Sequence, residues 1–196
     1  MRPDLNIILD WIEPGSRVLD LGCGDGTLLK ELERQKQVHG WGVEIDPKRI
    51  QACVEAGVNV IEHNLDQGLA PFRNARFETV VLSQTLQAVR RPDQLIEEML
   101  EISGHCIVTF PNFGHWRARI DQGLRGRMPV SEFMPYSWYN TPNIHFCTVK
   151  DFEALCRERR IRILDQTVSD RHQQSDSLMR AWPNLLAEIA IYRISR

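Results

Sequence analysis

The chain has no CxxC pair, and its five cysteines stand alone at positions 23, 53, 106, 147 and 156. Zinc ribbons and thioredoxin-like redox sites need thiols at close spacing, so the sequence supports neither. Scattered single cysteines in a chain of 196 residues are typical of a reducing compartment rather than of a disulfide framework. We therefore expect a cytoplasmic protein.

Long apolar runs are also missing. The first residues, MRPDLNIILDW, hold a short apolar stretch interrupted by Asn6 and Asp10, and no stretch approaches a membrane-spanning length of about 18 apolar residues. We expect neither a secretory leader nor a membrane span. The six histidines show no HExxH or similar spacing, so no metal site is expected.

A strong excess of charge of either sign is absent as well. The chain has 24 Lys and Arg against 26 Asp and Glu, a formal net charge of -2. This balance provides no chain-wide basic field for nucleic acid or an anionic membrane. With 42% hydrophobic and 26% charged residues, the chain can bury a sizeable core and is not disordered. Length and composition together predict one domain over residues 1–196.

Strand-like and helix-like segments alternate along the first 110 residues. We expect strands at 17–21, 40–45, 58–62, 79–83 and 105–110, and helices at 27–34, 47–57 and 92–103. Residues 112–147 then form an insert without a clear strand, a helix follows Thr148, and two last strands at 160–168 and 186–194 close the sheet. The pattern predicts an α/β fold with a doubly wound, mostly parallel seven-stranded sheet, an antiparallel edge strand and an insert after strand five.

The most informative motif is the loop VLDLGCGDG at 18–26, where the first strand passes into a helix. Its glycines allow a sharp turn and a close approach of a ligand to the backbone. Ligands of open parallel sheets bind at the carboxyl ends of the strands, where this loop is expected. A dinucleotide fingerprint, GxGxxG, would need Gly or Ala at the position of Thr27.

Carboxylates beside this loop favour a cationic cofactor without phosphates. Asp20 and Asp25 would repel a pyrophosphate, which prefers an uncharged loop at a helix N-terminus. Glu44, at the end of the second strand, can accept two hydrogen bonds from a ribose diol. The sequence therefore predicts a nucleoside cofactor at this edge of the sheet.

These segments resemble the class I S-adenosylmethionine-dependent methyltransferases, through VLDLGCGDGTLL (18–29), GVEIDP (42–47) and FETVVLSQTLQAV (77–89). From end to end, the chain is similar to the MetW family of methionine biosynthesis proteins. The more specific segments are SQTLQAVRRP (83–92), FPNFGHWRAR (110–119), LRGRMPV (124–130) and YNTPNIHFCT (139–148).

The resemblance implies a site for S-adenosylmethionine or S-adenosylhomocysteine. Its expected residues are Asp20, Gly22, Gly24, Gly26, Glu44, Asn64, Leu65, Asp66 and Ser83. The glycine loop and Asp20 would hold the methionine end, Glu44 the ribose, and the segment at 64–66 the adenine. The class usually has an acid at position 64. Asn64 accepts through an uncharged oxygen, so we expect a weaker bond and modest affinity, unless Asp66 substitutes.

No residue is plainly committed as a base or nucleophile. Methyl transfer from a sulfonium is an in-line displacement that relies on positioning, and it needs a base only when the acceptor must lose a proton. The acceptor-side candidates are Gln84, Gln87, Asn112, His115, Trp116, Tyr136, Trp138, Tyr139 and His145.

Three of these, His115, Tyr139 and His145, are candidate catalytic residues. His115 is equally well interpreted as a hydrogen-bonded packing residue. The aromatic side chains at 136–139 are interpreted as a satellite core, or alternatively as a lid or a cation cage. Gln84 and Asn112 receive no role.

Residues 115–127 carry four arginines and one aspartate. For this segment we favour a protein partner or a carboxylate clamp over nucleic acid. The MetW resemblance implies homoserine O-acyltransferase as the partner. Two functions stay open: a methyltransferase with an unidentified acceptor, and a non-catalytic, cofactor-sensing partner that activates that acyltransferase.

Overall fold

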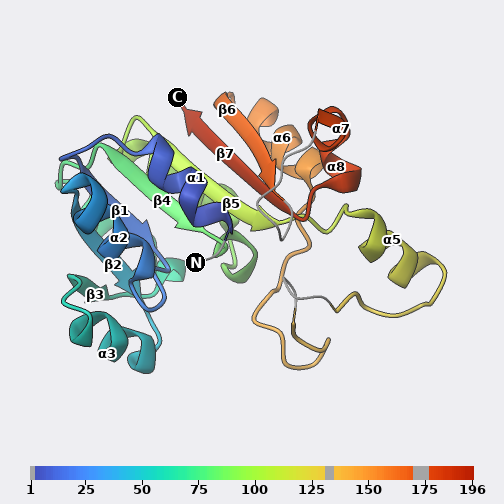
Figure 1. Ribbon diagram of the computed structural model, residues 1–196, viewed down its shortest axis with the longest axis horizontal. Helices are drawn as coiled ribbons and strands as arrows, with labels where there is room; N and C mark the ends of the chain where they lie inside the picture. The colour runs from blue at the N-terminus through green and yellow to red at the C-terminus, as the bar shows by residue number, and fades with distance from the viewer. Residues whose placement is uncertain (1–2, 131–134, 170–176) are drawn as a thin grey trace.

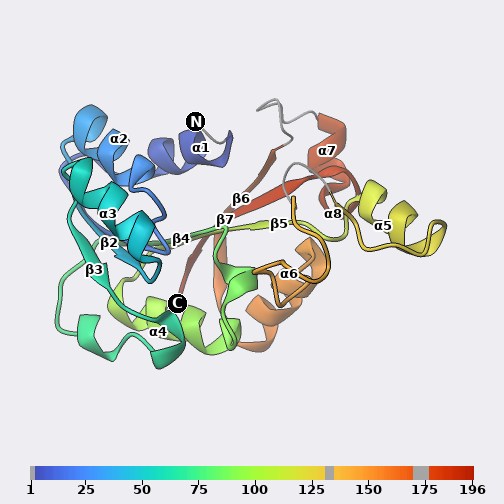
Figure 2. The same cartoon turned by 90° about the horizontal axis from the view of Figure 1, so that it is seen from below.

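The computed structural model describes residues 3–130, 135–169 and 177–196, which form one mixed sheet between two layers of helices (Figure 1 and Figure 2). The described residues form seven strands in the order β3-β2-β1-β4-β5-β7-β6. Their bounds are β1 Arg17–Leu21, β2 His39–Glu44, β3 Val60–Glu62, β4 Thr79–Ser83, β5 Cys106–Pro111, β6 Arg162–Ser169 and β7 Ile189–Ser195. The predicted α/β class and seven-stranded, mostly parallel sheet are confirmed.

The antiparallel pairings lie at one end of the sheet. The neighbours from β3 to β5 pair in parallel, whereas β7 runs antiparallel to both β5 and β6. The antiparallel strand β7 therefore lies one strand in from the edge, and β6 forms the edge itself.

Helices cover both faces of the sheet. They are α1 Pro3–Trp11, α2 Thr27–Lys36, α3 Pro47–Glu55, α4 Pro92–Ile102, α5 Trp116–Gly123, α6 Val149–Glu158, α7 Ser177–Ala181 and α8 Pro183–Leu186, with short 3-10 turns η1 Leu65–Gln67, η2 Ala70–Phe72 and η3 Leu86–Ala88. One buried cluster includes side chains of α1 and α2, and the other includes side chains of α4 and α6. Figure 2 shows these two pairs of helices on opposite sides of the sheet.

Strand β4 has three successive apolar residues at 80–82, because both of its faces are covered by helices. Val80 and Leu82 belong to the cluster under α4 and α6, and Val81 between them belongs to the cluster under α1 and α2. Successive side chains of a strand point to opposite faces, so a strand covered on both faces buries every residue. In β4 every residue from Val80 to Ser83 is buried, and Thr79 at its start is half-buried.

Local signals set the start of two helices. Asp46 accepts a hydrogen bond from the backbone N–H of Lys48, and Pro47 takes the first helical position of α3. Thr148 is the N-cap of α6, as the sequence predicts, and the structure shows that it forms a capping box with Asp151.

Helix α1 was not predicted, because residues 1–16 were read only as too short for a leader or a membrane span. Its apolar residues Leu5, Ile8 and Leu9 are buried, as is Ile12 just after it, and their spacing is that of an amphipathic helix. The structure places this helix on the sheet, and that packing stabilises a segment too short to be helical alone.

The later segments differ from the prediction in two details. The insert at 112–147 contains helix α5, which the sequence reasoning did not predict. The last strand begins at Ile189 rather than at 186, because Pro183 opens the short helix α8 just before it. Part of the predicted polar connection before this strand lies outside the described residues.

The chain path creates a crevice next to β1. The chain first builds outward through β2 and β3, then returns to form β4 on the other side of β1. Loops after neighbouring strands separate at such a switch point, which leaves room for a ligand at the carboxyl ends.

Candidate cofactor-binding site

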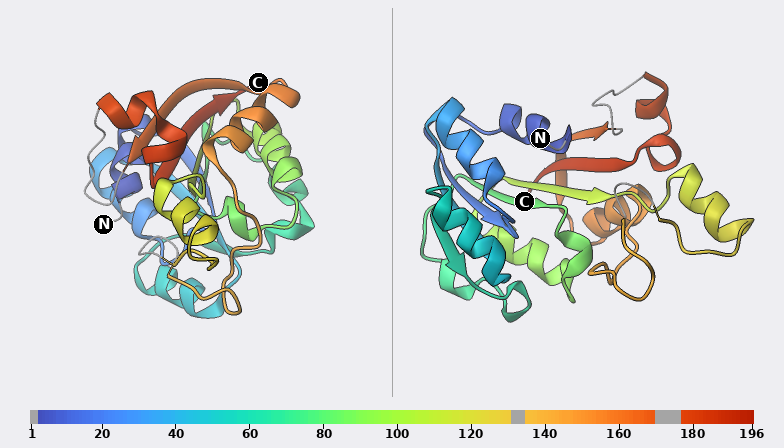
Figure 3. Two further views of the ribbon diagram at one scale, coloured as in Figure 1. Left: turned by 90° about the vertical axis from the view of Figure 1, so that its right-hand side faces the viewer. Right: turned by 60° about the horizontal axis from the view of Figure 1, so that its bottom comes forward.

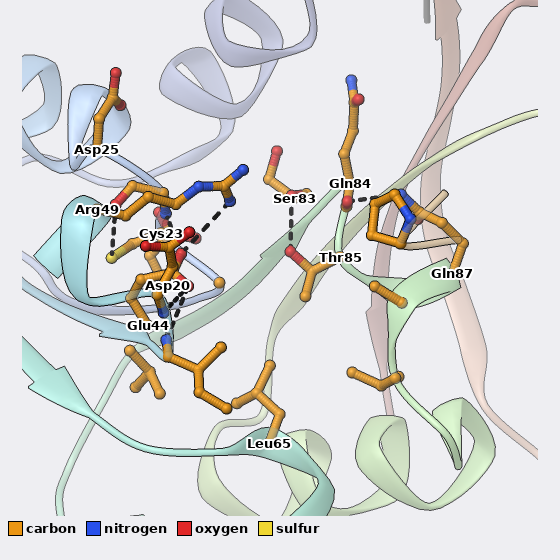
Figure 4. Close-up of a pocket in the computed structure, with 18 of the residues that line it drawn as sticks. Asp20, Cys23, Asp25, Glu44, Arg49, Leu65, Ser83, Gln84, Thr85 and Gln87 are labelled. Atoms are coloured by element: carbon orange, nitrogen blue, oxygen red, sulfur yellow. Dashed lines mark hydrogen bonds and ion pairs between the residues drawn. The ribbon is translucent and has the colours of Figure 1, made fainter. Parts of the chain in front are cut away.

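A cavity of about 1060 Å³ lies at the carboxyl ends of β1, β2 and β4. Figure 4 shows Asp20, Glu44 and Arg49 gathered on one side of this cavity, with Gln84 and Gln87 on the other. Residues 63–66 and residues 135, 136, 142 and 143 of the insert complete its wall. The fold thus brings together segments that are far apart in the sequence.

The glycine loop is held against β2 by its own backbone. The N–H groups of Gly22 and Cys23 both donate to the carbonyl oxygen of Val43, at 2.8 and 3.1 Å. Gly22 has a φ of 74°, and a Cβ added there would lie 2.4 Å from Oγ1 of Thr85. The turn therefore requires glycine both for its backbone conformation and for its contact with the segment after β4.

Glu44 is fixed by three backbone donors. Its Oε2 accepts from the N–H of Gly24 at 3.0 Å, and its Oε1 accepts from the N–H groups of Ile45 and Asp46 at 2.8 and 3.1 Å. The side chain is 6% exposed and lines the cavity. A carboxylate offers about four acceptor positions, so hydroxyl groups of a ligand can still bind on the cavity side.

Arg49 already contacts this carboxylate from α3. Its Nη1 lies 3.8 Å from Oε2 of Glu44, and its side chain is 56% exposed. Figure 4 places the guanidinium beside Glu44 and Asp20 at the cavity. The sequence analysis did not include Arg49, since an arginine on an exposed helix turn carries no signal of its own.

Two thiols lie under the loop. Sγ of Cys53 donates to the carbonyl oxygen of Gly24 at 3.2 Å and lies 3.9 Å from Sγ of Cys23. Burial, followed by the nearby carboxylate of Asp20, raises the pKa of Cys23 far above its usual range. Both cysteines are free, and Cys23 fits against Gly42, where any larger residue would meet its sulfur. These thiols are therefore neutral packing and hydrogen-bonding groups.

The two predicted adenine acceptors have partners within the chain. Oδ1 of Asn64 accepts from the N–H of Asp66 at 3.0 Å and caps η1. Oδ1 of Asp66 accepts from the backbone N–H of Arg90 at 2.8 Å. Its Oδ2 also pairs with the guanidinium of Arg90, at 3.6 Å from Nε. Asn64, Leu65 and Asp66 all line the cavity, and the polar groups of Asn64 and Asp66 are used in shaping the turn.

Ser83 and Gln84 meet a buried carboxylate that the sequence analysis missed. Oδ2 of Asp4 in α1 accepts from Ser83 Oγ, Gln84 Nε2 and Thr109 Oγ1, each at 3.2 Å. Asp4 is fully buried, and its neighbour Leu5 lines the cavity. These bonds tie α1 to the ends of β4 and β5 and give Gln84 a structural role. The available signal was an acid within the apolar face of an unrecognised amphipathic helix.

Gln87 links the cavity to the insert. Its side-chain nitrogen donates to the carbonyl oxygen of Gln84 at 2.7 Å, and its own carbonyl oxygen accepts from the N–H groups of Ile144 and His145 at 2.9 and 3.1 Å. The side chain is 6% exposed and lines the cavity, and its Oε1 has no hydrogen-bond partner within the described part of the chain.

The three candidate catalytic side chains lie outside the lining of this cavity as the described residues define it. His115 caps α5, where its Nδ1 accepts from the N–H of Arg117 at 3.4 Å. Burial, followed by the charge of Arg117, lowers the pKa of His115 to about 4. Tyr139 is 73% exposed and contacts Trp138 edge-on, and His145 lies 3.3 Å from the carbonyl oxygen of Arg90.

Two further residues from the sequence analysis, Gly26 and Asn112, have structural roles in the fold. Gly26 precedes α2 and lies outside the cavity lining, with Cys53 and Val58 close to where its Cβ would be. Asn112 is buried, donates to the carbonyl oxygen of Ala187 at 2.9 Å and accepts from the N–H of Gly114 at 3.0 Å. Asn112 therefore joins the end of β5 to the segment before β7.

Of the aromatic residues at 136–139, Tyr136 lines the cavity, whereas Trp138 and Tyr139 are largely exposed to solvent. These side chains therefore do not form a buried satellite core.

In the described ranges, no group of three or more His, Cys, Asp or Glu side chains is arranged to hold a metal ion. Within the same ranges, none of the helices has the length and apolar character needed to cross a bilayer.

A family model described as "Methionine biosynthesis protein MetW" matches residues 2–194. The chain belongs to the MetW family. This MetW chain is also 34% identical over 206 residues to the bifunctional methionine biosynthesis protein MetXA/MetW of Rhodopirellula baltica. The alignment covers 100% of the chain and 33% of that protein, so the chain spans about a third of its relative.

Solved structures share the fold of this MetW protein at low sequence identity. A SAM-dependent methyltransferase from Archaeoglobus fulgidus has a TM-score of 0.66 and 15% identity, covering 98% of this chain and 91% of that one. A chain from the complex between the Haloferax volcanii Trm112 methyltransferase activator and "the putative methyltransferase" has a TM-score of 0.67 and 14% identity. That match covers 98% of this chain and 88% of that one. The MetW chain thus has the class I methyltransferase fold.

Proposed function

We propose that this protein binds S-adenosylmethionine or S-adenosylhomocysteine in the cavity and acts in the cytoplasm as a cofactor-sensing partner of homoserine O-acyltransferase. The hydrogen bond between Gly24 and Glu44 carries the cofactor part of the proposal. It joins the two elements that a nucleoside would contact together, the glycine loop and the carboxylate at the end of β2.

The residues of the cavity fit the chemistry of this cofactor. A Cβ added at Gly24 would meet no atom within 4 Å, so the loop has open space at the place where a ligand would pass the backbone. Carboxylates at Asp20 and Glu44 suit a cationic amino acid nucleoside and a ribose diol. When bound, S-adenosylmethionine would supply an electrophilic methyl group on its sulfonium. The chain itself orients the cofactor and surrounds it.

The relative from Rhodopirellula baltica supports the partner part of the proposal. Its name joins MetXA and MetW in one chain, and the present chain corresponds to about a third of it. Two modules in one chain meet at a high effective concentration, which favours their acting together. The insert at 112–147 would link the cofactor to the partner, because four of its residues line the cavity while others are exposed to solvent, where a partner can contact them.

The cofactor part is tested by calorimetric titration with S-adenosylhomocysteine. Glu44→Gln keeps the shape of the side chain and removes its charge, so affinity should fall about tenfold or more. Glu62→Gln is the matched control, because Glu62 is the exposed neighbour of Glu44 in the register of β2 and β3. Equal affinities for wild type and Glu44→Gln would contradict the assigned site.

The partner part is tested with the purified acyltransferase. The initial rate of the acyltransferase should rise when the present protein is added. S-adenosylmethionine should change the size of that rise. The measurement includes Glu44→Gln, which should still bind the acyltransferase but respond less to S-adenosylmethionine. An unchanged rate with no complex would contradict the partner role.

Methyl transfer is the second candidate function. It is favoured by Gln87, which lines the cavity beside the insert and whose buried Oε1 has no hydrogen-bond partner among the described residues, so a turn of this amide would present an acceptor to a substrate. Production of S-adenosylhomocysteine that depends on an added acceptor, and that Gln87→Leu suppresses while cofactor affinity is retained, would support this function. No acceptor-dependent product over a panel of amino acid and carboxylic acid acceptors would count against it.

A further inference from the structure

Helix α5 is stabilised by few contacts with the rest of the protein. It has eight residues, and Ala118 is its one buried residue among them. Figure 1 and Figure 3 show it extending away from the sheet, with α7 and α8 near its base. Helices shorter than about 12–15 residues are marginal in water unless an apolar face is packed. A helix with so little packing is suited to receive a partner.

The base of α5 is nevertheless fixed. Nε of Arg119 donates to the carbonyl oxygen of Gly114 at 2.6 Å, and Arg117 lies 3.8 Å from the carboxylate of Glu188. His115 caps the first turn. These contacts orient the helix relative to the sheet, so its outer side chains are presented in a defined direction.

Large apolar side chains follow one side of this helix. Trp116 and Ile120 lie in α5 and Leu124 is its C-cap residue, which keeps a helical backbone conformation. The three are spaced four residues apart and are 41%, 36% and 84% exposed. Residues at this spacing form a stripe along a helix, since four residues make slightly more than one turn. We call these three residues the α5 stripe. Met128 and Val130 continue the exposed apolar side chains beyond it.

The charges around the stripe are basic. Arg117, Arg119, Arg125 and Arg127 flank it, against Asp121, which is paired with Arg125 at 2.7 Å. Three of these arginines, Arg117, Arg119 and Arg125, therefore have contacts within the chain. Exposed apolar groups rimmed by charged residues mark protein interfaces, and Trp and Arg are the residues that most often dominate them.

We propose that the α5 stripe docks into an apolar, acid-rimmed groove of homoserine O-acyltransferase. The inference rests on the proposed function and adds the surface through which the partner binds. Two observations support this choice of partner. The relative named MetXA/MetW carries a MetXA part and a MetW part in one chain. The arginines around the stripe favour acidic groups on the partner surface. The mode of binding is a helix that inserts its apolar side into a groove.

The test measures binding of the purified acyltransferase by titration calorimetry. Leu124→Asp places a charge at a position that is 84% exposed, so folding should be unaffected while the dissociation constant rises at least about tenfold. Val54→Asp is the matched control, because Val54 is 65% exposed on α3, and its dissociation constant should stay within about twofold of wild type. S-adenosylhomocysteine affinity should be the same in both variants.

Hydrogen exchange gives a second readout without substitution. Backbone amides of residues 116–124 should exchange at least about tenfold more slowly when the acyltransferase is bound, since docking stabilises the helix. Wild-type affinity in Leu124→Asp, or no change in exchange in α5, would overturn the inference while the proposed function stands. Absence of any complex with wild type would overturn both, and a dimer of the protein alone that Leu124→Asp disrupts would assign the stripe to a second copy instead.

Discussion

The backbone N–H of Gly24 donates to Oε2 of Glu44 at 3.0 Å. This bond joins the loop after β1 to the end of β2 at the mouth of the cavity. It also orients the carboxylate, since Oε1 is held from the other side by Ile45 and Asp46. A side chain whose position is set before the ligand arrives loses little conformational freedom on binding.

The two glycines of the loop should respond differently to alanine. Gly22→Ala combines a positive φ with a clash against Thr85, so the free energy of unfolding should fall by about 3 kcal/mol. Gly24→Ala meets no atom and should lose only about 1 kcal/mol, with weaker cofactor binding because its methyl group narrows the cavity. Urea denaturation and calorimetric titration would measure both quantities. Equal stability losses would contradict the assigned difference.

Arg49 should act as a competitor of the cofactor. Its guanidinium lies 3.8 Å from Glu44 at the position where ribose hydroxyls would bind, so Arg49→Ala should tighten binding of S-adenosylhomocysteine. Exposed ion pairs contribute up to about 1 kcal/mol, which corresponds to a gain of about two- to fivefold in affinity. Lys48→Ala, an exposed position on the same helix, is the control. Weaker binding in Arg49→Ala would show instead that the guanidinium contacts the cofactor.

His115 should make stability depend on pH. Its pKa in the folded protein is about 4, below the value of 6.5 expected when it is unfolded, because burial disfavours the charged ring. As pH falls from 6.5 to 4, the unfolded state gains the proton first, and the free energy of unfolding should fall by about 3 kcal/mol from this group.

The measurement is urea denaturation at several pH values. His115→Asn preserves a cap for α5 and should lack this part of the pH dependence. His39→Asn, at an exposed position, should keep it. If wild type and His115→Asn lose stability in parallel between pH 7 and pH 4, the assigned environment of His115 is wrong.

The position of the glycine loop and of its acidic neighbours at one edge of the sheet was largely predictable, and the residues on the opposite side of the cavity were not. Asp20 and Glu44 lie at the ends of β1 and β2, and the glycines directly follow β1, so their place at this edge of the sheet can be read from the local sequence pattern. Asp4 and Arg49 lie in helices whose orientation depends on tertiary packing. Periodicity alone does not show which cavity a helical side chain borders.

The same reason explains the catalytic candidates. His115 follows β5 closely, which suggested a position at the cavity, but it turns away to cap α5. A polar side chain just after a strand can serve either as a helix cap or as a base at the cavity, and only the path of the chain beyond it distinguishes the two.

The sequence by itself determined the parallel α/β class, the glycine loop with its acidic partner and the family to which the chain is similar. These features depend on local backbone geometry and on side chains within one turn or strand. Only the tertiary structure decided that Asp4 ties α1 to the ends of β4 and β5, that Arg49 lies beside Glu44, and that α5 exposes its apolar stripe. Such contacts join residues distant in sequence, and burial and direction are properties of the packed chain.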